Sequence, residues 1–190
     1  SSYAKSPDFG TAVYIAKTLV RLQRVEEGAD VLVKELARSH SPNKRQYNIV
    51  AEYLNKFNFH EQAIRVYENL ERRFTLTPEE YNNISDVNLK LNRLDLAEDY
   101  IKMALAEKRL PLFLMTYSEV QLKKGNNDLA EQALLETLKS DESNEHANVL
   151  LASVYVKQGR KEDAIKIINQ FDSVQSAHSQ KWASLRSQLD

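Results

Sequence analysis

Small side chains return at a nearly constant interval along this chain, and that periodicity limits the folds it can adopt. The series Gly28, Ala63, Ala97, Ala130 and Ala164 has spacings of 35, 34, 33 and 34 residues. The prolines keep a similar interval, and two glycines are separated by 34 residues: Pro7, Pro42, Pro78 and Pro111, then Gly125 and Gly159. Because three residue types share one period, the sequence predicts an array of similar units.

Apolar residues within each unit follow helical spacing. In the third unit, Tyr81, Ile84 and Leu89 mark one helix, and Ala97 and Ile101 mark a second. Short breaks between the two runs allow a tight reversal into an antiparallel pair. With only four glycines and four prolines, the chain is poor in the turn residues of an all-β fold. We therefore expect an all-α protein of about 10–11 helices.

A second column of small residues belongs to the first helix of each unit. Its members are Ala16, Ala51, Ser85, Ser118 and Ala152. Bulky residues such as Val50, Ile84 and Leu134 lie beside the two small columns. Small side chains at these positions let helix axes approach within the lower part of the usual ~8–10 Å packing range. Alternating small and large columns then predict a core that runs continuously through the array.

The fifth unit carries the pattern of a known family most fully. Leu151-Ala152, Tyr155, Gly159, Ala164 and Ile168 occupy positions at which this chain resembles the tetratricopeptide repeat. The resemblance covers residues 9–175, although Asn88 and Gln121 replace an expected aromatic residue. It implies a right-handed superhelical solenoid of five repeats. The expected order is a tail at 1–8, repeats at about 9–43, 44–77, 78–110, 111–144 and 145–175, and a capping helix at 176–190.

Composition narrows the function further. The net charge of −1 and the pI of about 6.4 supply no general attraction for nucleic acid or anionic lipid. No apolar run approaches the ~18 residues of a membrane span. The chain opens with Ser1-Ser2, so we expect a processed or excised form, and cytoplasm and bacterial periplasm both stay open.

Nothing in the sequence points to catalysis. It contains no glycine-rich phosphate loop and no His-Glu-x-x-His motif, and it has no cysteine. The four histidines are far apart in sequence and lack companions at metal-ligand spacing: His40, His60, His146 and His178. We therefore expect neither an enzyme nor a cofactor or metal site.

The resemblance implies a concave groove lined by the first helix of each unit. We expect a non-catalytic protein-interaction scaffold that binds a peptide or helix of a partner there, as a module of a larger bacterial assembly. The predicted contact residues are Asn48, Glu52, Asn55, Lys56, Asn82, Asn83, Asp86, Lys90, Met115, Glu119, Leu122, Lys123 and Val149. The carboxylate clamp used by chaperone-tail binders of this family is missing from these columns.

Each part of the predicted groove has a second interpretation. The lysines follow acids at i,i+4, as Lys56 follows Glu52, and such pairs also support a solvated helix. The asparagines either bind a peptide backbone or form ordinary polar surface. The apolar end of the groove either receives an amphipathic helix or is covered by the C-terminal segment. Two other functions stay open, namely single-strand RNA binding of the pentatricopeptide kind and homo-oligomerisation.

The small column yields a first test. Replacing Ala97 by leucine should lower the free energy of unfolding by roughly 1–3 kcal/mol, because a bulky side chain overpacks the helix crossing. Thermal unfolding followed by circular dichroism measures the effect. An unchanged midpoint would contradict this alignment of the repeats.

Overall fold

The structure, a computed structural model, describes residues 8–171 and 176–189. These residues form eleven α-helices and contain no β-strand. The chain divides into two compact units, Ser1–Asn92 and Arg93–Asp190, called here the N-terminal and C-terminal units. The expected all-α architecture of helix pairs is confirmed. Of the predicted tail at 1–8, only Asp8 lies within the described residues.

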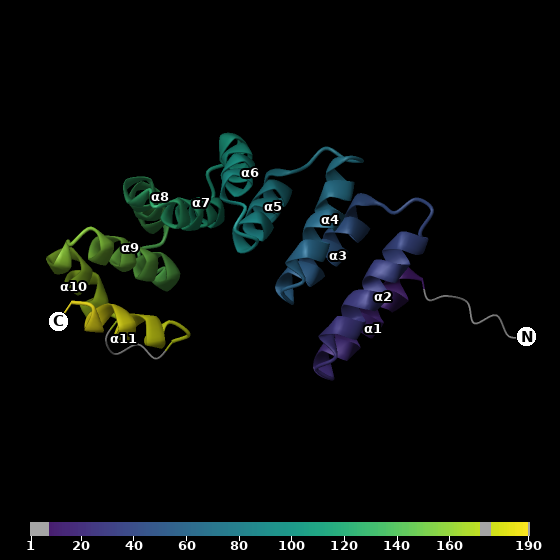
Figure 1. Cartoon of the computed structure of the whole chain (residues 1–190), viewed down its shortest axis with the longest axis horizontal. Coiled ribbons are helices and arrows are strands. Elements are labelled where there is room, and N and C mark those ends of the chain that lie inside the picture. The colour runs from purple at the N-terminus through teal and green to yellow at the C-terminus, as the bar shows by residue number, and fades with distance from the viewer. Residues whose placement is uncertain (1–7, 172–175, 190) are drawn as a thin grey trace, which may run out of the picture. The chain divides into compact units, whose positions relative to one another are not determined.

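The N-terminal unit contains two helix pairs and one further helix. The first pair is α1 (Phe9–Arg21) with α2 (Val25–Arg38), and the second is α3 (Lys44–Lys56) with α4 (His60–Glu71). The helix α5 (Pro78–Lys90) follows and packs against α4. Figure 1 shows α1 beside α2 and α3 beside α4, and successive pairs also touch through α2 and α3.

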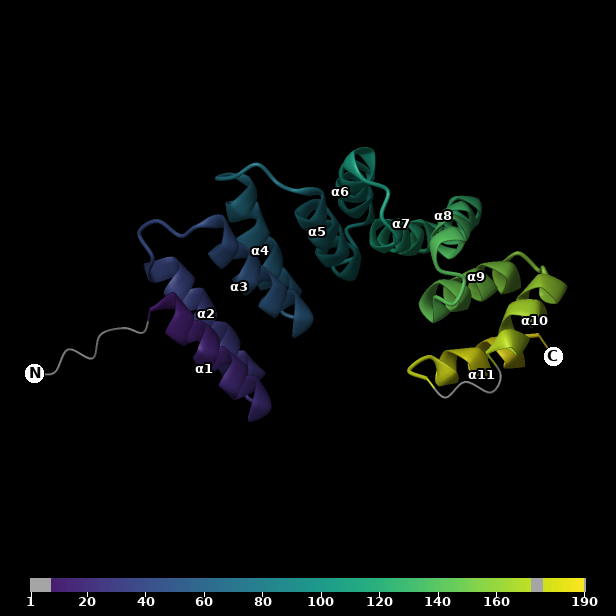
Figure 2. The same ribbon diagram turned by 180° about the vertical axis from the view of Figure 1, so that it is seen from behind.

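The C-terminal unit continues the same alternation and ends differently. Its helices are α6 (Leu94–Glu107), α7 (Pro111–Lys124), α8 (Asn127–Ser140), α9 (Glu145–Lys157), α10 (Lys161–Gln170) and α11 (Ser179–Ser187). Neighbouring helices from α6 to α10 pack in sequence order. The last helix, α11, packs against both α9 and α10, as the view from behind shows (Figure 2).

Each first helix ends in the same backbone turn. Five residues with positive φ stand there: Gln23, Asn58, Asn92, Gly125 and Gly159. Their spacing of 35, 34, 33 and 34 residues repeats that of the small column. At four of the turns the next N–H donates to a carbonyl five residues earlier, as Arg160 N–H does to Tyr155 over 2.8 Å. This Schellman arrangement reverses the chain within two or three residues.

The small residues at the start of the second helices are fully buried in the helix packing. Ala63, Ala97, Ala130 and Ala164 are all 0% exposed. Gly28 takes the equivalent place in the first unit, and a Cβ there would lie 2.1 Å from the hydroxyl oxygen of Tyr53. That hydroxyl donates a hydrogen bond to the Val25 carbonyl over 3.0 Å. The tyrosine explains why this position holds glycine instead of alanine.

Helix starts are fixed by local side-chain bonds. Asn43 with Gln46 and Thr77 with Glu80 form reciprocal capping boxes at α3 and α5. Proline occupies the first turn of α5 and α7, where its fixed φ suits a helix and no N–H is lost. Among the described residues, every helix is too short or too polar to cross a bilayer.

The left-handed turns lead to a stability prediction. Gly159→Ala should lower the free energy of unfolding by about 1 kcal/mol, because an L-side chain is disfavoured at its φ of 72°. Gln23→Gly, at a φ of 59°, should raise it by roughly 0.5–1 kcal/mol. Urea unfolding followed by circular dichroism measures both, with Lys157→Ala as the helical control. Equal effects of the three substitutions would contradict the role of these turns.

Candidate partner-binding surface

The asparagines of the predicted groove bind neighbouring helices of their own unit. Asn48 in α3 donates its amide to Glu80 Oε1 in α5 over 2.6 Å. Lys44 Nζ lies 2.7 Å from the other oxygen of the same carboxylate. Glu80 is only 5% exposed and also caps α5, so one buried carboxylate joins two successive first helices.

The charges around Glu80 shift two pKa values in opposite directions. Burial raises the pKa of Glu80, but hydrogen bonds from Lys44, Asn48 and the Thr77 N–H, with the charge of Lys44, together lower it by more, so the pKa lies below its usual range. The pKa of Glu52 is raised, first by partial burial and then by the charge of Glu80. Glu52 is nevertheless exposed, and its carboxylate stays available to a partner cation.

A second set of polar contacts lies one turn further along the same helices. Asn55 donates to Asp86 Oδ2 over 2.8 Å and accepts from Lys90 Nζ over 3.2 Å. Lys90 also contacts Asp86 Oδ2 at 2.7 Å, and His60 Nδ1 lies 3.1 Å from Asn55 Oδ1. Burial, followed by the charge of Lys90, lowers the pKa of His60. Asn55 thus joins α3, α4 and α5 and is not a free amide.

Two further asparagines of the predicted site differ in accessibility. Asn82 is 5% exposed, so it offers almost no surface to a partner. Its burial corrects the expectation that it contacts a ligand directly. Asn83, the next residue, is half-buried.

The lysine column is exposed, and the predicted i,i+4 ion pair of Lys90 is observed. Lys90 pairs with Asp86, whereas Lys56 Nζ lies 5.6 Å from the ring centre of Phe57. Lys56, Lys90 and Lys123 each stand in the last turn of a first helix. Cations there interact favourably with the C-terminal end of the helix dipole, which accounts for their recurrence without a ligand.

The apolar end of the predicted groove is covered by other parts of the C-terminal unit. Met115 is 8% exposed in a cluster with Leu134, and Leu122 packs on the same cluster. Val149 is 1% exposed in a cluster with Trp182 and Leu185 of α11. Met115 and Val149 are therefore core residues, and at Val149 the covering residues belong to the C-terminal segment.

Trp182 holds α11 in place through two kinds of contact. Its ring stacks on Phe171 at 5.0 Å between ring centres. Its indole N–H donates to Glu145 Oε1 over 2.8 Å, and Ser176 donates to the same oxygen. Hydrogen bonds from Ser176 and Trp182 are the main reason that the pKa of Glu145 is lowered. This indole–carboxylate contact fixes the helix that covers Val149.

Two histidines that are distant in sequence meet in this unit. The rings of His146 and His178 stack at 5.4 Å, His146 Nε2 lies 3.3 Å from Glu119 Oε1, and His178 Nδ1 lies 3.5 Å from Glu145 Oε2. Burial, and then the charge of His178, lower the pKa of His146. Sequence spacing gave no signal of this pair, because α11 returns along α9. No group in the described part of the chain has the three His, Cys, Asp or Glu side chains that a metal site needs.

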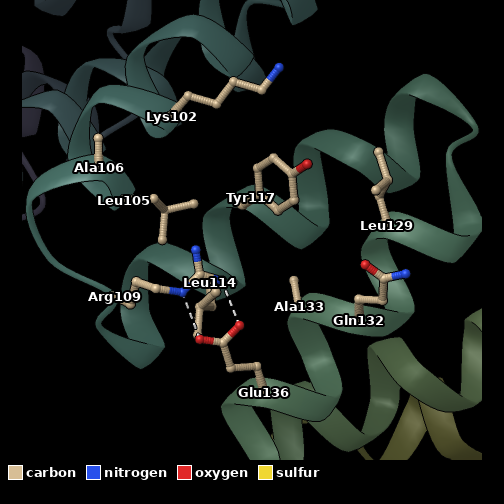
Figure 3. Close-up of a pocket in the computed structure, with 10 residues that line it drawn as sticks. All are labelled: Lys102, Leu105, Ala106, Arg109, Leu114, Tyr117, Leu129, Gln132, Ala133 and Glu136. Atoms are coloured by element: carbon tan, nitrogen blue, oxygen red, sulfur yellow. Dashed lines mark hydrogen bonds and ion pairs between the residues drawn. The ribbon is translucent and has the colours of Figure 1, made fainter.

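A cavity of about 400 Å³ lies between α6, α7 and α8, and its charged groups are already paired (Figure 3). Arg109 and Glu136 face each other in a two-point ion pair, with Nε–Oε1 and Nη2–Oε2 distances of 2.8 and 2.5 Å. Lys102 on the rim contacts Glu98 at 2.6 Å. The cavity therefore presents little uncompensated charge to a ligand.

Glu98 links successive helices of the C-terminal unit much as Glu80 does in the other unit. It contacts Lys102 of α6 at 2.6 Å and Lys124 of α7 at 2.5 Å. Hydrogen bonds from Lys102 and Lys124 lower the pKa of Glu98 to about 2. Its side chain is 14% exposed, so these contacts are shielded from solvent.

Comparison with protein families agrees with this geometry. The model of the tetratricopeptide repeat matches residues 121–189. No curated protein sequence matches the chain. The C-terminal helices therefore match the tetratricopeptide-repeat model, and nearly the whole chain has the fold of solved tetratricopeptide-repeat structures.

Three solved structures illustrate the shared fold. A tetratricopeptide-repeat protein from Parabacteroides merdae has a TM-score of 0.80 at 15% identity, over 99% of this chain and 73% of that one. PilW, a type IV pilus biogenesis factor, has a TM-score of 0.75 at 19% identity, over 95% and 86%. YrrB, a repeat protein with an unusual peptide-binding site, has a TM-score of 0.70 at 16% identity, over 97% and 94%. Such identities show a common fold.

The pairing of Glu98 can be tested by its pH dependence. Glu98→Gln should lower the free energy of unfolding at pH 7 by about 1–2 kcal/mol, after allowance for solvent screening. Because the folded pKa of about 2 lies below the ordinary 4.5, this contribution is complete above pH 4.5 and is lost as pH falls toward 2.

Urea unfolding at several pH values measures the difference between wild type and variant. Glu107→Gln, an exposed carboxylate on the same helix, serves as the control and should change little. An equal loss in both variants at pH 7 would show that the pairing of Glu98 carries no special stability.

Proposed function

We propose that this protein is a non-catalytic interaction scaffold that binds a peptide segment of a partner protein along its first helices. The observation that carries the proposal is the polar surface of α3 and α5 that internal contacts leave exposed. Glu52, Lys56 and Lys90 are exposed on these helices, held on a backbone fixed by the contacts of Asn48 and Asn55. A surface that is rigid before binding loses little conformational entropy on binding.

The burial of Met115 and Val149 changes the kind of ligand that we expect. Met115 and Val149 are core residues, so neither is open to an apolar helix laid along α7 and α9. The ligand that fits is an extended, polar segment carrying both acidic and basic side chains. Acidic groups would face Lys56 and Lys90, and basic groups would face Glu52. Such contacts set orientation and the rate of association more than affinity.

The similar structures support a place for the protein in a bacterial assembly. YrrB is described as having a peptide-binding site, and PilW as a factor in type IV pilus biogenesis. By analogy with these proteins, we propose that the chain is a module that holds one component of a larger bacterial complex. This part of the proposal rests on fold similarity.

Peptide selection tests the surface directly. Peptides of about fifteen residues are selected from a random phage library on the wild-type chain, and their Kd is measured by isothermal titration calorimetry. The variant Glu52→Lys/Lys56→Glu keeps the net charge and reverses its pattern on α3. We expect it to bind the selected peptides about tenfold more weakly, equivalent to about 1.4 kcal/mol.

The matched control is Glu26→Lys/Lys34→Glu, which makes the same exchange on exposed positions of the second helix α2. Equal binding by wild type and the α3 variant would refute the surface. Filter binding with mixed-sequence RNA and sedimentation velocity across a dilution series address the alternatives. Salt-sensitive micromolar RNA binding, or concentration-dependent dimers that the α3 exchange abolishes, would replace the proposal.

A further inference from the structure

A second groove lies in the N-terminal unit, formed mainly by the second helices. Its volume is about 470 Å³, and it runs between α2, the loop after it, the start of α3 and the length of α4. The walls include Leu36 from α2, Pro42 from the loop, Tyr47 from α3 and Val66 from α4. Since the proposed peptide surface belongs to exposed residues of α3 and α5, this groove is a separate feature.

The floor of the groove is apolar and the rim is basic. Leu36, Tyr47 and Val66 are 9%, 5% and 9% exposed, so they form a firm base that lies next to the protein core. Arg65 and Arg73 stand on the rim and are exposed. The groove lining contains no aspartate or glutamate.

The two rim arginines are not neutralised by the protein. Arg73 lies 6.0 Å from the ring centre of Tyr47, and neither arginine forms an ion pair with a carboxylate in the described residues. The cavity in Figure 3 is different, because there Arg109 is held at two points by Glu136. Two unpaired guanidinium groups beside an apolar floor favour a ligand that brings both carboxylates and an apolar group.

The spacing of the arginines limits the length of that ligand. Arg65 and Arg73 are eight residues apart along α4 and its final turn, which corresponds to roughly 12 Å of helix. An extended peptide covers that distance in about three to four residues. A peptide with two acidic residues four positions apart, and one apolar residue between them, matches both the charges and the floor.

We propose that the groove between α2 and α4 binds an acidic peptide segment of this kind. The apolar side chain fills the space above Leu36 and Val66, and the two carboxylates pair with Arg65 and Arg73. The peptide lies along α4, with Asn69 between the two arginines as an amide within the lining. The chain would then hold two peptide segments at once, one on its first helices and one on its second helices.

A nucleic acid fits the groove less well than a peptide. Phosphates would meet the arginines, but the protein has a net charge of −1 and no basic excess to follow a nucleic-acid backbone. A polar backbone also leaves the apolar floor unfilled, whereas a leucine or phenylalanine side chain covers it.

Fluorescence anisotropy tests the proposal on the whole chain. The probe is a fluorescein-labelled heptapeptide with glutamate at its second and sixth positions, phenylalanine at its fourth, and serine elsewhere. Arg65→Glu/Arg73→Glu should raise the Kd for this probe at least about tenfold, because two charge-assisted contacts become repulsive. The control Arg45→Glu/Arg72→Glu, with the same change in net charge on exposed positions outside the groove, should stay within about twofold.

Three further measurements separate this site from charge attraction alone. A probe with glutamine in place of glutamate, and one with serine in place of phenylalanine, should each bind wild type about tenfold more weakly. Ala37→Trp, which places a large side chain in the groove without changing charge, should also weaken binding about tenfold. Circular dichroism confirms that each variant keeps its helices. Glu52→Lys/Lys56→Glu should leave the binding of this probe unchanged, which separates the groove from the surface on α3.

Several results would overturn the proposal. One is that the wild-type chain shows no saturable binding of the peptide at concentrations up to about 1 mM, which we take as the weak limit of specific recognition. Another is equal weakening by both double variants, which would show general charge attraction. A third is stronger competition by a short single-stranded RNA than by unlabelled peptide, which would make the groove a phosphate-binding site.

Discussion

The close approach of helix axes at small residues is the constraint on which this structure depends. Ala97 and Ala130 are completely buried at these crossings, and at Gly28 the neighbouring Tyr53 leaves no room for a Cβ. Since the same left-handed turn recurs at the end of each first helix, the chain is set up for the same packing again in successive pairs within each unit. The positive-φ turns and the small side chains recur at the same intervals of 33 to 35 residues. The repeat is therefore a property of the backbone and the side chains together.

Buried carboxylates provide a second kind of link between successive helices. Glu80 joins α3 to α5 and Glu98 joins α6 to α7, each through lysine ammonium groups. Arg160 does the same between α8 and α10 through Glu131, at 2.7 Å. These polar links are local to each crossing, so a change in one pair has little reason to spread to distant pairs, as expected for a repeat array.

The sequence predicted the helix pairs and the buried small columns because those depend on local periodicity. It did not predict which of the groove residues are buried or bonded within the protein. Val149 has the spacing of a groove position, yet α11 covers it, and only the return of a distant segment decides that outcome. Asn55 likewise has the sequence position of a free groove amide, but in the structure it donates a hydrogen bond to Asp86. The His146–His178 stack and the unpaired Arg65 and Arg73, in α4 and just after it, also depend on tertiary structure, which residue spacing does not encode.

The indole–carboxylate contact of Trp182 holds α11 against the α9–α10 pair. A stack of like helix pairs has no inherent number of members, because the rear face of each pair is shaped to receive another. Here α11 packs on α9 and α10 and occupies a face of that pair. With its tryptophan bonded to Glu145, the segment keeps the apolar residues of that face, among them Val149, away from solvent.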